Sequence, residues 1–185
     1  MVCQIILPTD DKIRTLVKIS EGCISFQEYF VKRKCIPKIL GLKYSGIKKA
    51  KISLDAIKAI EVADFIVIAP SNPLVSIKPI IDIPSFKKAI KDQRRKVIAV
   101  SPIISGKTVK GPASKMLKQL GYKSDAFAAL NFYKNICDNF VIDHSDKNFK
   151  DQFKNRGQRC YMTNILMNSI KDKKSLAQTL IKILS

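Results

Sequence analysis

Hydrophobic and polar positions follow two different periods along this chain. In the first 50 residues the apolar side chains alternate, and Gly22 lies in a turn between the first two runs, which predicts a hairpin and a further strand. The predicted strands are residues 14–20, 23–31 and 37–44. After Ser53, a suitable N-cap, the apolar residues Leu54, Ile57 and Ile60 are three apart, which predicts a helix.

The remainder of the chain alternates between strand-like and helix-like segments. The predicted strands are residues 65–69, 96–100, 139–142 and 160–165. The predicted helices are residues 84–91, 113–120, 125–136 and 148–156, and a C-terminal segment that carries Leu176, Leu180, Ile181 and Leu184. Such alternation is typical of a mainly parallel sheet with flanking helices. We therefore interpret residues 1–185 as a single α/β, Rossmann-like domain, in which a β-rich segment (1–50) with an N-terminal β-hairpin precedes an alternating β/α segment (51–185).

The segment from Phe65 to Pro79 is the strongest candidate for a binding site. Its first five residues are apolar, as in a strand buried on both faces, and a Pro-Ser-Asn-Pro turn follows at residues 70–73. Open α/β folds bind ligands at such turns, where hydroxyls, amides and backbone N–H groups suit a phosphate or a ribose. The alternative is an ordinary loop whose polar side chains cap the next helix.

The net charge of +19, from 34 basic and 15 acidic residues, favours anionic partners. The basic residues are nevertheless spread along the chain in short clusters. These clusters are residues 32–34, 48–49, 94–96 and 171–174. No aromatic residues are interleaved with them and no nucleic-acid recognition motif is present, so a solvated, lysine-rich surface is the preferred interpretation and nucleic acid is not the expected partner.

The five cysteines show no spacing typical of a zinc site, and the lone histidine, His144, has no cysteine near it. Their odd number and the lack of a signal peptide favour reduced thiols and a cytoplasmic location. No apolar run approaches 18 residues, so no membrane span is expected.

Four segments in register carry a resemblance to a known family. They are residues 7–33, 59–81, 97–121 and 139–146. On these segments the chain resembles the 2-phospho-L-lactate transferases of coenzyme F-420 synthesis. The segments keep the order and approximate spacing of that family, so the resemblance covers nearly the whole chain.

A sister family, the gluconeogenesis factors, is similar in fold and binds nucleotide sugars. Its members tend to have Gly-Ser-Leu-Tyr-Thr-Ser where this chain has residues 71–76, and they lack a loop like residues 101–113. The sequence therefore favours the transferases. Ala69 and Ser105 depart from the pattern, because they stand where glycine is usual, and both restrict their loops slightly.

The resemblance also implies a Gly-rich N-terminal half that has no counterpart in this sequence. Neither a G-x-G-x-x-G nor a Walker A motif occurs. We expect the chain to correspond to the C-terminal portion of the transferase, with strand edges that need a partner. The partners that follow from this expectation are a complementing N-terminal fragment and a second copy in a homodimer.

The resemblance implies an enzyme, a transferase of the 2-phospholactyl or phosphoenolpyruvyl group. The donor would be linked to guanosine diphosphate and the acceptor would be the deazaflavin Fo, whose ribityl hydroxyl attacks the phosphorus as GMP leaves. Mg²⁺ is the implied cofactor, since such transfers depend on positioning and charge stabilisation. The alternatives are a non-catalytic nucleotide-binding remnant and a gluconeogenesis-factor-like protein.

Two loops carry the candidate nucleotide- or phosphate-binding residues. They are Ser71, Asn72 and Ser76 in the first loop, and Ser101, Lys110 and Gly111 in the second. Lys110 would offset phosphate charge, and helix caps, an Asx turn and a solvated lysine are the structural alternatives. No catalytic residue is assigned. Asp10 and Asp11 are metal-site candidates with solvated turn residues as the alternative, whereas Tyr133 and Asp143 suit packing and strand termination.

Overall fold

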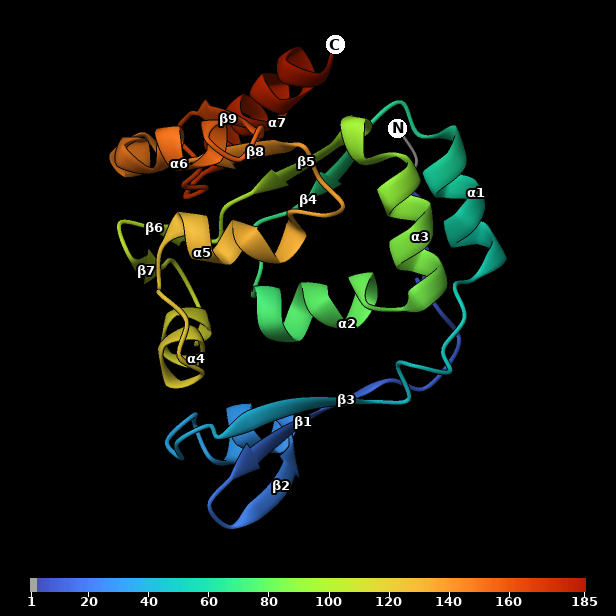
Figure 1. Ribbon diagram of the computed structural model, residues 1–185, viewed down its shortest axis with the longest axis vertical. Helices are drawn as coiled ribbons and strands as arrows, with labels where there is room; N and C mark the ends of the chain where they lie inside the picture. Colours follow the sequence, from blue (N-terminus) through green and yellow to red (C-terminus); the bar gives the residue numbers. More distant parts are fainter. Residues whose placement is uncertain (1–2) are drawn as a thin grey trace.

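The computed structural model describes residues 3–185 and contains two principal sheets (Figure 1). The larger has four strands in the order β4-β5-β8-β9, and all of its neighbouring pairs are parallel. The smaller is antiparallel, in the order β2-β1-β3. This arrangement confirms the predicted α/β class with a mainly parallel sheet, flanking helices and an N-terminal hairpin.

The parallel sheet is buried because its inner strands have apolar side chains on both faces. Its strands are β4 (Ile66–Ile68), β5 (Val97–Val100), β8 (Asn139–Ile142) and β9 (Arg159–Met162). Every residue of β5 and β8 is buried. The burial on both faces that the sequence predicted for residues 65–69 is wrong, because β4 lies at the edge of the sheet and its Val67 is 40% exposed. Val97 and Ala99 join one hydrophobic cluster and Ile98 and Val100 join another, because successive side chains point to opposite faces.

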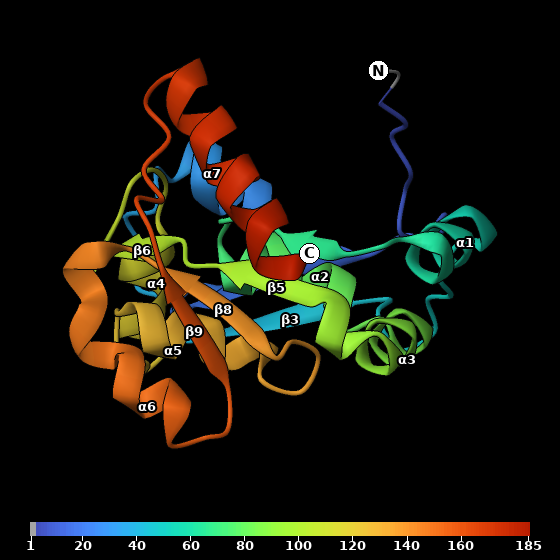
Figure 2. The ribbon, with the colours of Figure 1, turned by 90° about the horizontal axis from the view of Figure 1, so that it is seen from above.

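Helices cover both faces of this sheet. They are α1 (Leu54–Val62), α2 (Lys78–Ile81), α3 (Pro84–Asp92), α5 (Ala126–Leu130), α6 (Lys150–Lys154) and α7 (Ile170–Leu184). The remaining helix, α4 (Ala113–Gln119), packs against the small sheet. Helix α7 lies over one face of the sheet (Figure 2), where Leu176 and Leu180 share a hydrophobic cluster with Ile98 and Val141. The other face packs against residues of α1, α2, α3, α5 and α6.

Local signals in the sequence explain where several helices begin and end. The Ser53 hydroxyl accepts a hydrogen bond from the backbone N–H of Ala56, which confirms the predicted cap of α1. Ser169 and Asp172 form a reciprocal capping box at the start of α7. Gly121 ends α4 as predicted. Its φ of 81° is in the left-handed region, where glycine has little steric penalty.

The prediction for the second N-terminal strand was wrong beyond its first few residues. The small sheet contains β1 (Arg14–Ile19), β2 (Gly22–Ser25) and β3 (Gly41–Ser45). Glu28–Lys32 forms a π-helical turn instead of a strand. The Ser25 hydroxyl accepts the N–H of Glu28, and the buried Tyr29 hydroxyl donates to the carbonyl of Cys35. These side-chain bonds offer the backbone an alternative to continued strand pairing.

The predicted helix 125–136 was also too long. Helix α5 ends at Leu130 and a 3₁₀ turn, Asn131–Tyr133, follows. The backbone then turns so that Cys137 can be buried beside β8, where its thiol lies 3.3 Å from the carbonyl oxygen of Val97. Two other helical turns are Arg94–Lys96 and His144–Phe149. The second leads into α6 (Lys150–Lys154), which lies within the predicted helix 148–156 and is shorter than it.

The small sheet packs on the rest of the molecule through side chains as well as backbone groups. Val17 and Ile19 are buried in a cluster with Met116 and Leu117 of α4. The Tyr44 hydroxyl donates to the carbonyl of Leu74. In addition, the N–H of Ile39 donates to Oε1 of Gln119 at 3.0 Å, so residues from the β-rich segment help to fix α4.

Two absences within residues 3–185 concern the wider predictions. None of the helices in this part of the chain is both long and apolar enough to cross a membrane. All five cysteines are free thiols, as predicted. Burial raises the pKa of Cys137 to about 12, so this thiol stays protonated at neutral pH.

Candidate functional site

The loops after β4 and β5 meet at the carboxyl edge of the parallel sheet. These strands are hydrogen-bonded neighbours, with Ile66 opposite Val97 and Ile68 opposite Ala99. A cavity of about 340 Å³ lies between their loops, and the hairpin after β5 and the segment that enters α7 also line it. Open α/β sheets bind ligands at this edge. The two loops that the sequence singled out therefore share one cavity.

Asn72 shapes the first loop. Its Oδ1 accepts the N–H of Leu74 at 3.0 Å and caps a π-helical turn, Pro73–Ile77, that continues into α2. Its Nδ2 lies 3.4 Å from the sulfur of Met116. The Asx turn, which was the structural alternative for Asn72, is thus present, and the side chain lines the cavity as well.

Ser101 shapes the second loop. The side chain is buried, and its hydroxyl donates to the carbonyl of Ile103 at 2.8 Å while it accepts the N–H of Ile103 at 3.1 Å. Both bonds stay within the turn that leaves β5. Ser101 therefore stabilises the conformation of this loop, since its hydroxyl proton is already donated to the carbonyl of Ile103.

A small hairpin, which the sequence analysis missed, forms the outer wall of the cavity. It pairs β6 (Ile103–Ile104) with β7 (Lys107–Thr108). At its tip Ser105 has φ of 48°, in the left-handed region that favours glycine. The Ser105 side chain therefore lies on a strained backbone.

The hairpin leads into the Lys110-Gly111 turn. The Thr108 hydroxyl donates to the carbonyl of Gly111 at 3.0 Å, and Gly111 has φ of 81°. This turn places Lys110 at the cavity, just before α4 begins at Ala113. Gly111 itself does not line the cavity; its left-handed backbone conformation forms the turn that carries Lys110.

Two lysines give the cavity its positive charge. Lys110 comes from the second loop and Lys173 from the first turn of α7. Neither makes an ion pair among the described residues, and the lining contains no acidic side chain. Sequence reasoning missed Lys173 as a site residue. The available signal was the basic cluster 171–174, which was interpreted as solvated surface.

The remaining predicted residues lie beside the cavity instead of lining it. Ser71 is half-buried between Pro70 and Asn72, which do line it. Ser76 is exposed on the π-helical turn, where its N–H donates to the carbonyl of Asn72 at 3.0 Å. Neither serine caps a helix. Ligand contact by any of the six candidate residues stays a prediction.

Two aspartates follow β8 at the same edge. Burial opposes ionisation of Asp143, but hydrogen bonds from Ser145 and from the N–H of Ile165, with the charge of His144, outweigh it and lower its pKa. Burial raises the pKa of Asp146, which is 3% exposed, and the nearby charges of Asp143 and Asp125 add to that effect. Asp143 terminates β8 as predicted, and Asp146 anchors the hairpin.

The described residues do not fit the Mg²⁺ site that the resemblance implies. Within residues 3–185, no group of three histidine, cysteine or acidic side chains is placed to hold a metal ion. Asp11 accepts the backbone N–H of Lys51 at 2.8 Å and Asp10 is exposed, so both act as turn residues. Mg²⁺ prefers oxygen ligands that include carboxylates, and the cavity lining offers none.

The parallel sheet and the basic cavity at its carboxyl edge define a Rossmann-like α/β protein with a candidate ligand site. Sequence comparison assigns the family: the profile of 2-phospho-L-lactate transferase CofD matches residues 2–182, and the chain belongs to this family. That assignment confirms the resemblance found in the sequence.

Similar proteins in archaea carry the same family name. A 2-phospho-L-lactate transferase of Methanococcoides burtonii is 35% identical over 96% of this chain and 58% of its own length. One from Methanosarcina barkeri is 36% identical, over 95% of this chain and 57% of its own. A third, from Methanocaldococcus jannaschii, is 35% identical, over 97% and 57%. The chain thus spans little more than half the length of these relatives.

Solved structures support the fold. Two crystal structures of a UPF0052 family protein from Bacillus halodurans resemble this chain with TM-scores of 0.61 and 0.59. The sequence identity is 16%, and the match covers 94% of this chain and 60% of the other. At this identity the likeness concerns the fold alone.

Proposed function

We propose that this chain carries the donor-binding part of a 2-phospho-L-lactate transferase. The cavity at the ends of β4 and β5 would bind the diphosphate of a guanosine-diphosphate-linked lactyl or enolpyruvyl donor. The single observation that carries this proposal concerns the ammonium groups of Lys110 and Lys173: within residues 3–185 neither makes an ion pair, and no acidic side chain lines their cavity. Family membership supports the reaction class.

The backbone around the cavity suits the same ligand. The helical segment that begins at Pro73 has the positive end of its dipole at the cavity, although Pro73 has no N–H and the N–H of Leu74 already donates to Asn72. Lys110 follows a loop of backbone amides held by Thr108 and Gly111. Ser101 and Asn72 keep these amides in place because their own side chains bond within the loops.

In the proposed reaction, the acceptor hydroxyl of Fo forms a bond to the lactyl-bearing phosphorus while the bond to the GMP oxygen breaks. Negative charge grows on the leaving phosphate, and the proton of the acceptor hydroxyl passes to water. Lys110 and Lys173 would stabilise this charge if they approach the phosphoryl oxygens more closely in the transition state. Mg²⁺ stays a prediction from the family, with ligands outside the cavity lining.

A second candidate function is nucleotide binding without transfer. It is favoured by the absence of any carboxylate or imidazole among the residues that line the cavity, since these groups are the usual general bases. Both candidates require that GDP binds at Lys110 and Lys173. They differ in whether the acceptor is converted to product.

An activity measurement separates the two candidates. The purified chain is incubated with Fo, the donor and Mg²⁺, and products are resolved by chromatography with deazaflavin fluorescence detection. Formation of the phospholactyl or enolpyruvyl adduct with an equal amount of GMP supports the transferase. Saturable GDP binding with no adduct supports the binding protein. Lack of both GDP binding and adduct would contradict the proposal that this cavity serves a guanylate.

A further inference from the structure

The amino edge of the parallel sheet carries a second basic hollow. A cavity of about 740 Å³ is lined by Lys87, Lys88, Lys91, Arg94 and Lys134, with no acidic residue among its lining. A smaller cavity of about 330 Å³ shares Lys91 and Arg94 with it and adds two basic residues, Arg95 and Lys96, and one acidic residue, Asp92. We call this continuous surface the α3 groove.

The fold creates this concentration of charge from segments that are separate in the sequence. Lys87, Lys88 and Lys91 lie on α3, Arg94 lies on the turn before β5, and Lys134 precedes β8. Figure 2 shows the loop before β8 beside the segment that joins α3 to β5. The N–H of Asp138 also donates to the carbonyl of Arg94 at 3.3 Å, which ties the two segments together.

Little of this charge is neutralised within the protein. Asp138 pairs with Arg94 at 3.3 Å, and Asp82 pairs with Lys87 at 3.4 Å. Lys88, Lys91 and Lys134 make no ion pair among residues 3–185. Several unpaired like charges repel one another across a concave surface, so an anion that enters it removes an unfavourable interaction.

We propose that the α3 groove binds a chain of phosphate groups, such as a single-stranded nucleic-acid backbone or inorganic polyphosphate. Ammonium groups on flexible stems suit phosphates because they need no fixed geometry. Lys87 and Lys91 lie about 6 Å apart along the axis of α3, one helical turn, and present repeated charges to a repeating anion. This site is separate from the carboxyl-edge cavity and independent of the proposed transferase function.

The same lining argues against two other occupants. No aromatic side chain is present for base stacking, so binding should not depend on base sequence. Its apolar members are Pro84 and Ile136, and Ile136 is 2% exposed, so the groove lacks the accessible apolar anchor on which protein interfaces depend. An acidic protein segment is therefore the less favoured ligand.

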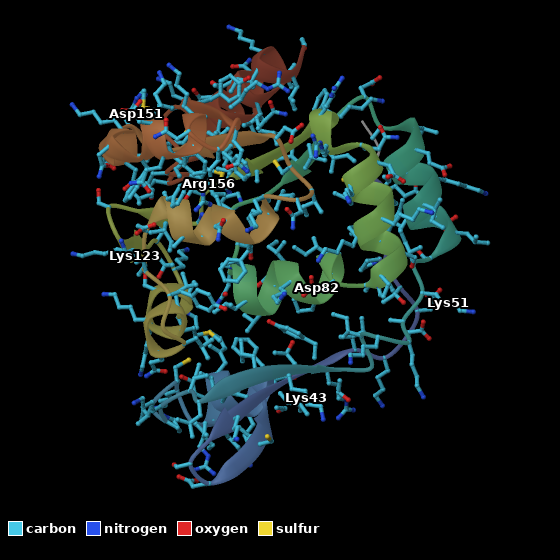
Figure 3. The ribbon with its side chains drawn as sticks, viewed as in Figure 1. Lys43, Lys51, Asp82, Lys123, Asp151 and Arg156 are labelled. Atoms are coloured by element: carbon cyan, nitrogen blue, oxygen red, sulfur yellow. The ribbon has the colours of Figure 1, made fainter. Side chains whose placement is uncertain are left out.

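The test measures fluorescence anisotropy of a labelled oligothymidylate with the wild-type chain and two variants. The groove variant combines Lys88→Glu, Lys91→Glu and Lys134→Glu. The matched control combines Lys43→Glu, Lys51→Glu and Lys123→Glu, which changes the net charge equally at exposed positions away from the groove (Figure 3). Circular dichroism and thermal unfolding establish that both variants fold.

We expect binding to weaken with salt, with a slope of log K against log salt of about −2, because three unpaired lysines release counterions. The groove variant should lose at least roughly tenfold in affinity, and the control less than threefold. Unlabelled polyphosphate and oligothymidylate serve as competitors. The competitor that displaces the labelled oligomer at the lower phosphate concentration shows whether the groove prefers polyphosphate or a nucleic-acid backbone. Equal losses in both variants, no salt-dependent binding, or stronger competition by polyglutamate would overturn the proposal.

Discussion

Both carboxylate oxygens of Asp146 accept the backbone N–H of Ser105, at 3.2 and 3.1 Å, across 41 residues of sequence. This contact joins the segment after β8 to the tip of the β6–β7 hairpin. The hairpin in turn carries Thr108 and Lys110 to the cavity. The buried carboxylate of Asp146 is therefore a positioning group for one wall of the candidate site.

Asp146 should give the protein a distinctive pH dependence. Because burial raises its pKa, the folded protein binds this proton more tightly than the unfolded chain does. Its contribution to stability therefore falls as pH rises from the ordinary aspartate pKa of 3.8 through the raised value. In Asp146→Asn this loss is absent. Urea unfolding over a pH series should show the variant gaining stability relative to wild type as pH rises, and a relative loss would contradict the account.

The left-handed backbone conformation of Ser105 leads to a second prediction. Ser105→Gly keeps the N–H that Asp146 accepts and removes a side chain from a φ of 48°. We expect the free energy of unfolding to rise by about 0.5–1 kcal/mol, since relief of left-handed strain exceeds the entropy cost of glycine. Ser175→Gly, within α7, is the control and should lose about 0.5 kcal/mol. Destabilisation by Ser105→Gly would show that the side chain has an unrecognised structural contact.

Ser101 predicts a stability effect through its paired bonds with Ile103. Ser101→Ala leaves a buried N–H and carbonyl without their partner, and should cost about 1–3 kcal/mol in urea unfolding. Ser76→Ala, at an exposed position whose side chain makes no hydrogen bond among the described residues, should change stability by less than about 0.5 kcal/mol. Equal effects of the two substitutions would exclude the loop-shaping role of Ser101.

The two cavity lysines predict the affinity for GDP. Removal of either charge in Lys110→Ala or Lys173→Ala should weaken GDP binding roughly tenfold in calorimetric titration, as expected for one charge-assisted contact. Lys118→Ala serves as the control, because Lys118 is exposed on α4 and does not line the cavity. The assignment of phosphate contacts fails if the control loses as much affinity as the cavity variants.

Strands β5 and β8 were predicted with nearly correct ends, and both are buried between two layers of helices. The sequence predicted burial on both faces for residues 65–69 instead, and this was wrong: β4 is an edge strand and its Val67 is 40% exposed. The turns after β4 and β5 were expected to hold a site, and the pairing of these strands brings them to one cavity.

Contacts between distant segments explain what sequence reasoning missed. The hairpin at Ser105 depends on Asp146, and Lys173 reaches the cavity only because α7 packs on the sheet. Likewise, the π-helical turn at Tyr29 depends on its bond to the carbonyl of Cys35, in place of the strand predicted there. The α3 groove was also missed, since its charges come from three separate segments.

The most direct test of the central claim is a crystal structure of the chain with bound GDP. The account predicts that the diphosphate lies in the cavity between the loops after β4 and β5, within hydrogen-bonding distance of the ammonium groups of Lys110 and Lys173. GDP bound elsewhere on the protein, with that cavity free of ligand, would contradict it.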